Sequence, residues 1–269
     1  MPRSLALHTW TLDTTPLADV LRIARHTGWD AVELRRLDFA RASESGQSAA
    51  EVLDLVRQSG LAVACVGVEA GWMFASGPER RRLRRVFAET CDWAAQLQCA
   101  TVMSPVDRGR GDPHQAADNL REVGDLAAEH GVRLALELNS QAEQFKTLNR
   151  VREVVTRAGH PHCGLLVDTY HLYRSDADVL PLRDLAPDEI AYVQYSDVPG
   201  DGLRAGVTTD RLPPGQGIVP FAEIFRLLEE KGYRGYLSYE APNPSAWARN
   251  PEDVAREALA ATRAVLPGA

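Results

Sequence analysis

Short apolar runs alternate with longer amphipathic segments along the whole chain, and this alternation restricts the fold more than any other feature of the sequence. Runs of four to seven residues are typical of buried strands, and longer segments with helical periodicity are typical of surface helices. Strands that alternate with helices pair in parallel through right-handed crossovers. The predicted strands are residues 5–10, 31–34, 62–68, 100–103, 133–137, 164–168, 190–195 and 236–240. The predicted helices lie near 15–27, 48–59, 79–97, 113–130, 143–158, 178–185, 219–231 and 251–265.

Eight such units are the number at which a parallel sheet closes on itself, so the predicted fold class is α/β, a (β/α)8 TIM barrel. A doubly wound open sheet is the alternative. Glycine stands between a predicted helix and the next predicted strand at several joints, where it can end a helix in the left-handed conformation. These glycines are Gly28, Gly60, Gly131 and Gly232. The length of 269 residues suits one barrel, and no linker divides the chain, so we expect residues 1–269 to form a single domain.

The composition excludes several classes of protein. A net charge of −7 disfavours binding to nucleic acid or to an anionic membrane surface. The four cysteines have no CxxC spacing, which indicates a reduced protein without a thiolate zinc site. No apolar run approaches the roughly 18 residues of a membrane span, so we expect a cytoplasmic protein. The arginine-rich segment 79–87 is expected to form a solvated helix face or a contact between the subunits of a homo-oligomer.

Polar side chains stand at or near the ends of four consecutive predicted strands. Glu137 ends LALE, Asp168 ends GLLVD, Gln194 lies near the end of the seventh strand, and Glu240 ends GYLSYE. The carboxyl ends of barrel strands meet at one face, which carries the active site in barrel enzymes. Three acids and an amide that converge there would repel each other unless a cation held them together. A set of oxygen ligands favours a hard divalent cation, with Mg²⁺ and Mn²⁺ as the first candidates and Co²⁺ as a further one.

Several segments carry a resemblance to a known family. DTYHLY at 168–173 resembles the D-x-x-H motif of the xylose-isomerase-like TIM-barrel superfamily of sugar isomerases and epimerases. LALELNS, YVQYSD, DRLPPGQG and YLSYEAPNP resemble its other active-site segments in order, and the DRLPPGQG segment is similar to that of inosose isomerases. The resemblance implies four metal ligands, a substrate-contacting histidine and a substrate-contacting arginine. The implied ligands are Glu137, Asp168, Gln194 and Glu240, and the implied substrate contacts are His171 and Arg211.

Gln194 departs from the pattern of many ketose epimerases and inosose isomerases, which carry histidine on the seventh strand. At this position the chain is more similar to hydroxypyruvate isomerases and to bacterial 3-dehydroshikimate dehydratases, so the resemblance leaves the reaction open. The superfamily also contains endonuclease IV, a zinc nuclease with additional histidines at the ends of its third and fourth strands. Val68 and Met103 stand near those ends here, which argues against a nuclease.

The predicted function is proton transfer on a small keto-sugar or cyclic polyol ketone by a divalent-metal-dependent isomerase or epimerase. Glu137 and Glu240 are the candidate catalytic residues, one removing and one returning a proton through a metal-stabilised enediolate. Two alternatives remain open. The first is a metal-dependent dehydratase, a lyase acting on 3-dehydroshikimate or an inosose, with His171 as the acid. The second is a barrel without catalytic activity that binds a partner.

Further residues are candidates for contact with a small polyol, keto-sugar or keto-acid substrate. Trp10 is expected to form an apolar wall, although a place in the core is the alternative. Glu33 ends the second strand and is a candidate support for the metal site or for a helix end. A keto acid would need cations near its carboxylate, and four arginines follow predicted strand ends. These are Arg35, Arg36, Arg108 and Arg110.

Overall fold

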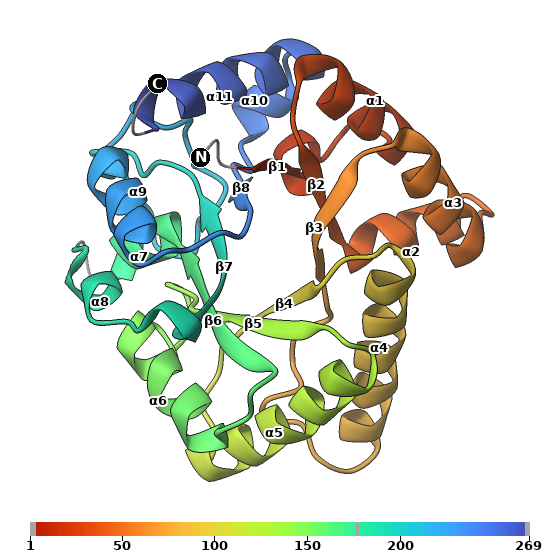
Figure 1. The fold of residues 1–269 in the computed structure, drawn as a ribbon, viewed down its shortest axis with the longest axis vertical. Coiled ribbons are helices and arrows are strands. Elements are labelled where there is room, and N and C mark those ends of the chain that lie inside the picture. Colours follow the sequence, from red (N-terminus) through yellow and green to blue (C-terminus); the bar gives the residue numbers. More distant parts are fainter. Residues whose placement is uncertain (1–3, 176–177, 267–269) are drawn as a thin grey trace.

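The computed structural model describes residues 4–175 and 178–266, and within them the chain forms a closed barrel of eight parallel strands (Figure 1). Each strand pairs with the strands before and after it in sequence, and β8 pairs with β1 to close the sheet. The predicted (β/α)8 fold is therefore confirmed, and the open sheet is excluded. The strands are β1 (Leu5–His8), β2 (Ala31–Arg35), β3 (Ala62–Gly67), β4 (Thr101–Pro105), β5 (Arg133–Glu137), β6 (Cys163–Asp168), β7 (Ile190–Tyr195) and β8 (Leu237–Tyr239).

Helices surround the barrel as an outer ring (Figure 1). The principal crossover helices are α1 (Leu17–Thr27), α3 (Ala49–Ser59), α4 (Gly77–Gln96), α5 (Pro113–Glu129), α6 (Leu148–Ala158), α8 (Leu180–Arg183), α9 (Phe221–Glu230) and α11 (Pro251–Val265). Additional helices follow strand ends or precede strands, namely η1 (Thr9–Leu12), α2 (Arg36–Glu44), α7 (Thr169–Ser175), η2 (Pro187–Glu189) and α10 (Pro244–Trp247). In the described ranges no helix combines the length and the apolar character that a membrane crossing requires.

Local sequence explains where helix α3 begins and ends. The hydroxyl of Ser48 accepts a hydrogen bond from the N–H of Glu51, and the carboxylate of Glu51 accepts one from the N–H of Ser48 at 2.7 Å. This reciprocal capping box satisfies backbone donors that the first turn leaves free. Gly60 ends the helix at φ 70°, in the left-handed region where glycine has no steric penalty. The predicted glycine stop is confirmed here.

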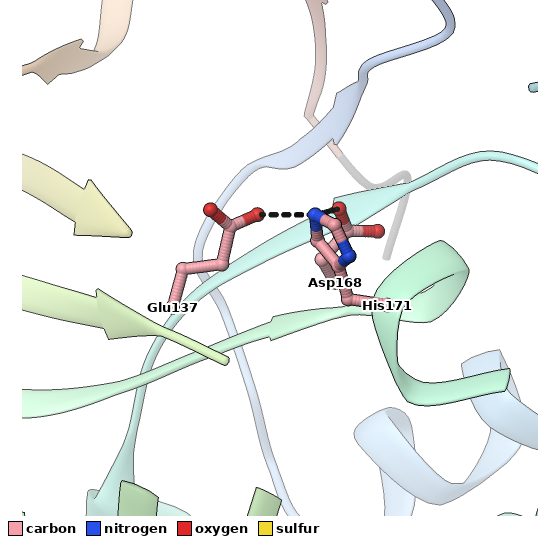
Figure 2. A group of neighbouring side chains, drawn as sticks. All are labelled: Glu137, Asp168 and His171. Carbon is pink, nitrogen blue, oxygen red and sulfur yellow. Dashed lines mark ion pairs between the residues drawn. The ribbon is translucent and has the colours of Figure 1, made fainter. Parts of the chain in front are cut away.

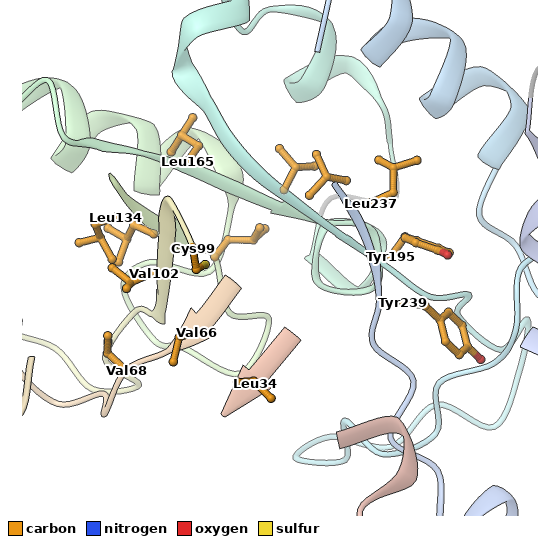
Figure 3. Close-up of a cluster of buried hydrophobic side chains, with 14 of the residues drawn as sticks. Leu34, Val66, Val68, Cys99, Val102, Leu134, Leu165, Tyr195, Leu237 and Tyr239 are labelled. Atoms are coloured by element: carbon orange, nitrogen blue, oxygen red, sulfur yellow. The ribbon is translucent and has the colours of Figure 1, made fainter. Parts of the chain in front are cut away.

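Apolar side chains fill one layer between the barrel and the helices and another inside the barrel. The outer layer takes branched side chains from successive strands, including Leu34, Val66, Val102, Leu134 and Leu165 (Figure 3). The inner layer contains alanine most often, and its side chains point into the barrel from the strands. Its members are Ala6, Ala31, Ala64, Cys65, Met103, Ala135, Leu166 and Tyr192. The residues two positions further along β1, β2, β5, β6 and β7 therefore share the interior face of the barrel, at its carboxyl end.

The prediction that the first strand continues to Trp10 is wrong. The strand ends at His8, and Thr9–Leu12 form the 3-10 helix η1. The imidazole Nδ1 of His8 accepts a hydrogen bond from the N–H of Trp10 at 3.0 Å, which turns the chain away from the sheet. A side-chain acceptor of this kind competes with strand pairing for the backbone donor.

Asp197 anchors the long loop between β7 and α9. This buried carboxylate accepts four backbone hydrogen bonds of 2.8–2.9 Å, and they come from both ends of the loop. The backbone of Asp197 also exchanges two hydrogen bonds with Leu212, next to Arg211. A Cβ atom at position 217 would lie 2.1 Å from the carbonyl oxygen of Val198, so only glycine fits this close approach. The four N–H donors belong to Val198, Gly215, Gly217 and Val219.

We expect Asp197→Asn to destabilise the fold by about 2–4 kcal/mol, because the amide nitrogen of asparagine cannot accept the hydrogen bonds of two buried N–H groups. The matched control is Asp201→Asn, which removes the same charge from an exposed position of the same loop. Urea unfolding followed by circular dichroism measures both. Equal unfolding midpoints for the two variants would contradict the anchoring role.

Candidate metal centre and active site

The polar residues predicted at four strand ends lie together at the carboxyl mouth of the barrel. Glu137 and Asp168 are the last residues of β5 and β6, Gln194 is the penultimate residue of β7, and Glu240 directly follows β8. Asp168 and Gln194 are fully buried, and each glutamate is only 5% exposed. The strand pairing aligns Asp168 with Gln194 in register. Carboxylates at such depth need a compensating positive charge.

Arg211 supplies part of that charge from the loop after β7. Its Nη1 donates to Oδ2 of Asp168 at 2.7 Å and to Oε2 of Glu240 at 3.0 Å. The guanidinium also lies over the ring of Tyr170, 4.4 Å from its centroid, and the side chain is 2% exposed. The predicted substrate-contacting arginine is therefore a deeply buried ion-pair partner of two of the predicted metal ligands.

His171 reaches the same cluster from helix α7 rather than from a loop. The backbone N–H and the hydroxyl of Ser140 lie 3.2 and 2.9 Å from its Nδ1, so Nε2 is the nitrogen that faces the acids. This Nε2 lies 3.9 Å from Oε1 of Glu137 and 3.9 Å from Oδ2 of Asp168 (Figure 2). One atom from each of these three residues falls within 4.8 Å of the others, a spacing that suits a metal ion.

The titration behaviour of the acids follows from burial and from their neighbours. Burial raises the pKa of Glu137 well above its usual value, and the charges of Glu240 and Asp168 raise it further. Burial also raises the pKa of Glu240, to about 7, although Arg211 opposes the shift. Burial alone would raise the pKa of Asp168, but the guanidinium of Arg211 and the neighbouring His171 bring it below its usual value. Burial lowers the pKa of His171 to about 3, so its ring is neutral near pH 7.

Gln194 is held by a residue on the far side of the barrel. Its Nε2 donates to Oε1 of Glu33 at 2.8 Å, and the hydroxyl of Tyr192 donates to Oε2 of the same carboxylate at 3.1 Å. The other end of the amide, Oε1 of Gln194, is buried and has no hydrogen-bond partner. Burial raises the pKa of Glu33 to about 8, with a further contribution from Glu240.

His8 is a site residue for which the sequence pattern predicts no role. It is 3% exposed, and its Nε2 lies 3.4 Å from Oε1 of Glu240 and 3.6 Å from Oε1 of Glu33. Burial lowers the pKa of His8 well below its usual value, and the charges of Arg35 and Arg211 lower it further. The sequence signal for His8 was its place two residues after the interior Ala6, the same spacing that Glu137 has from Ala135 and Asp168 has from Leu166.

A cavity of about 490 Å³ opens onto the cluster and is large enough for a small organic substrate. Trp10 forms part of its wall from η1, which is consistent with the predicted apolar contact. Met103 also lines the cavity, but it lies in the middle of β4 and not at the strand end, which is Pro105. The remaining lining includes His8, Val68, Glu69, Glu137, Asn139, His171, Thr208, Arg211 and Glu240.

The four candidate arginines differ in how far their charge is already neutralised. Arg35 pairs with Asp13 and Asp38, at 2.6 and 2.8 Å. Arg36 pairs with Glu89, and Arg110 lies 3.3 Å from Glu143 outside the cavity lining. Arg108 lines the cavity, is exposed, and has no acidic side chain within ion-pair distance in the part of the chain that the structure describes.

The residues at the mouth fit a divalent cation. Three carboxylates against one guanidinium leave an excess of two negative charges when all are ionised, which one divalent cation would balance. The unpaired Oε1 of Gln194 adds a neutral oxygen donor that otherwise loses its hydration without compensation. His171 adds a nitrogen donor to the oxygen set that the sequence predicts.

Comparison with known proteins agrees with the barrel fold. Residues 21–265 match the family model described as xylose isomerase-like TIM barrel. A 3-dehydroshikimate dehydratase of Pseudomonas aeruginosa is 33% identical over 152 residues, which are 55% of this chain and 23% of that protein. An inosose isomerase of Bacillus velezensis is 21% identical over 266 residues, which are 95% of this chain and 94% of that protein.

A solved structure has the same fold over nearly the whole length. The crystal structure of the IolI protein with a bound zinc atom superimposes with a TM-score of 0.88 at 19% identity, and 98% of each chain is covered. The chain spans less than a quarter of the length of the dehydratase, whereas it covers 98% of the IolI structure, and the family model matches residues 21–265 of the chain. The chain belongs to the xylose isomerase-like TIM barrel family.

Proposed function

We propose that this protein is a divalent-metal-dependent isomerase or epimerase of a small keto-sugar or cyclic polyol ketone. The observation that carries the proposal is the buried cluster of Glu137, Asp168 and Glu240 around Arg211 at the base of the cavity. The proposed metal ligands are Glu137, Asp168, Gln194 and Glu240. The inosose isomerase similar to this chain over 95% of its length supports the reaction class.

The cavity holds candidate groups for each step of the proposed reaction: polarisation of the carbonyl, proton transfer and binding of the substrate oxygens. A bound cation would polarise the substrate carbonyl and stabilise negative charge on the substrate. Glu137 and Glu240 both line the cavity beside the proposed cation, where one would remove a proton from the substrate and the other would return it. Arg211 and His171 line the cavity beside the carboxylates and are placed to hold substrate oxygens.

A metal-dependent dehydratase is the second candidate, and the free charge of Arg108 favours it. Among the arginines of the cavity lining, Arg35 and Arg36 are already paired with acids, whereas Arg108 is open to a substrate carboxylate. The structure argues against His171 as the acid of this reaction, because burial keeps its ring neutral near pH 7; its Nε2 is placed instead to hydrogen-bond a departing hydroxyl, and a protonated carboxyl group of the cluster would supply the proton. The dehydratase of Pseudomonas aeruginosa at 33% identity supports this reading for part of the chain.

Incubation of the metal-loaded protein with polyol ketones, inososes and 3-dehydroshikimate in D₂O tests the proposal. We expect deuterium at the carbon next to the carbonyl without loss of water, measured by NMR and mass spectrometry. Loss of water would establish the dehydratase in its place. EDTA should abolish turnover, and Mn²⁺ or Mg²⁺ should restore it, with Co²⁺ and Zn²⁺ tested beside them. Full turnover in a verified metal-free sample would refute metal dependence.

Glu137→Gln and Glu240→Gln should each lower turnover by about 10²–10⁴-fold, because an amide cannot carry the proton. Both residues are also proposed ligands, so the metal content of each variant is measured and activity is compared at saturating Mn²⁺. Glu69→Gln is the matched control, since Glu69 lines the same cavity but pairs with Arg82 at its rim. Near wild-type turnover in either glutamine variant would disprove its role in proton transfer.

The metal-free protein should lose stability as the pH rises from about 6.5 to 8; below this range the buried His8 and His171 oppose the decline, because their lowered pKa values leave them protonated only in the unfolded state. Glu33 and Glu240 have folded-state pKa values raised to about 8 and about 7, so in this range the folded state binds more protons than the unfolded state. The free energy of unfolding should fall by about 1.4 kcal/mol per pH unit for each of these acids, as long as it is protonated in the folded state and ionised in the unfolded state. Saturating Mn²⁺ should remove the decline, because a cation favours the ionised acids. Calorimetry with EDTA and with Mn²⁺ measures both curves, and identical pH slopes would contradict the prediction.

A further inference from the structure

Glu33 is a buried charged group that the proposed reaction does not use. It lies on β2, within the barrel, and has no exposed surface. Both of its carboxylate oxygens accept hydrogen bonds from residues of β7, one from Nε2 of Gln194 at 2.8 Å and one from the hydroxyl of Tyr192 at 3.1 Å. A carboxylate in such a place must be compensated, and its two donors come from the strand that carries a proposed ligand.

The contact with Glu33 fixes which end of the Gln194 amide points where. A glutamine amide has a donating nitrogen and an accepting oxygen, and rotation by half a turn exchanges them. In the structure the nitrogen faces Glu33, and the oxygen is the buried end without a partner. Once a bound cation keeps Glu33 ionised, the reversed amide would place its oxygen against a carboxylate oxygen at the 2.8 Å contact, and the two would repel. Glu33 therefore selects the orientation in which the amide oxygen of Gln194 is left free to bind a cation.

We propose that Glu33 is a positioning residue for the metal centre: its carboxylate, held by Tyr192, orients the Gln194 amide so that the oxygen is the atom offered to the cation. The inference rests on the proposed function, because it requires Gln194 to bind metal. It explains the unpaired Oε1 of Gln194 and the place of a fully buried acid beside the proposed metal centre. Supporting residues of this kind orient metal ligands and are commonly worth 10–100-fold in metal affinity.

The closest alternative is that Glu33 acts only through its negative charge. Two substitutions separate the alternatives, because both remove the charge but only one removes the hydrogen-bond acceptor. Glu33→Gln retains an oxygen that can accept from Nε2 of Gln194, whereas Glu33→Met has a similar length and no strong acceptor. Combining each with Gln194→Ala shows whether the effect passes through the amide.

The experiment measures Mn²⁺ affinity of the metal-stripped full chain by calorimetry, with the absorption spectrum of bound Co²⁺ as a second readout. We expect Glu33→Met to weaken Mn²⁺ binding by about 10–100-fold and to change the Co²⁺ spectrum. Glu33→Gln should retain most of the affinity. In the Gln194→Ala background neither substitution should weaken binding further.

The remaining outcomes are decisive in the other direction. Equal losses for Glu33→Gln and Glu33→Met in both backgrounds would show a charge effect and overturn the inference, as would unchanged affinity of Glu33→Met. Unchanged affinity of Gln194→Ala would overturn it too. Wild-type protein that binds no Mn²⁺ would refute the proposed metal centre itself, and the inference with it. If Glu33→Met does not fold, Tyr192→Phe is measured in the wild-type and Gln194→Ala backgrounds, because it removes the hydroxyl that supports Glu33 and keeps the carboxylate. A loss of Mn²⁺ affinity only where Gln194 is present supports the inference. No such loss overturns it.

Discussion

The contact of Arg211 with Asp168 and Glu240 is the interaction on which the carboxyl mouth of this barrel depends. Three carboxylates lie within a few ångströms of one another and are almost completely buried. Without a nearby cation each would take up a proton, and the raised pKa values of Glu137 and Glu240 show how strongly burial favours that outcome. Asp168 alone stays below its usual pKa, because Arg211 donates directly to it.

The position of Arg211 in turn depends on the loop that follows β7. The backbone pairing of Asp197 with Leu212 and the four N–H groups bound by the Asp197 carboxylate hold this loop against the barrel. The ring of Tyr170 supports the guanidinium from one side. A segment that looks irregular in sequence is therefore the rigid support of the central cation.

Sequence alone located the acids because strand periodicity is strict. Ala135 and Leu166 face the barrel interior, so Glu137 and Asp168, two residues later, must face the same way at the carboxyl end. The same reasoning applies to His8 after Ala6 and to Glu33 after Ala31. The sequence pattern does not indicate what these two residues contact, because their partners lie across the barrel. Gln194 is 161 positions from Glu33, and no local pattern shows which side chains meet over such a separation.

Local side-chain hydrogen bonds account for the elements that periodicity missed. His8 caps the turn that ends β1, and Oδ1 of Asp168 accepts from the N–H of Tyr170 at the start of α7. The second of these contacts begins a helix directly at a strand end, and that helix carries His171 into the cluster. Asp168 thus shapes the backbone with one oxygen while the other oxygen binds Arg211. The dual use leaves Oδ2 of Asp168 as the oxygen that faces Arg211 and His171.

Selectivity between the two candidate reactions would depend on residues outside the carboxylate cluster. Proton removal next to a carbonyl is common to isomerisation and dehydration, so the carboxylates and the cation they would hold do not distinguish them. The distinction would come from residues around the cluster. These residues would determine whether a substrate carboxylate is bound by a cationic side chain and whether a departing hydroxyl is hydrogen-bonded. Arg108, with its charge free at the cavity wall, is placed to bind a substrate carboxylate, and His171, whose Nε2 faces the acids, is placed to hydrogen-bond a departing hydroxyl. A keto acid such as 3-dehydroshikimate would pair with Arg108, whereas an uncharged inosose would not, so Arg108 would distinguish the candidate substrates by charge, and the contacts to the departing hydroxyl would distinguish the reactions.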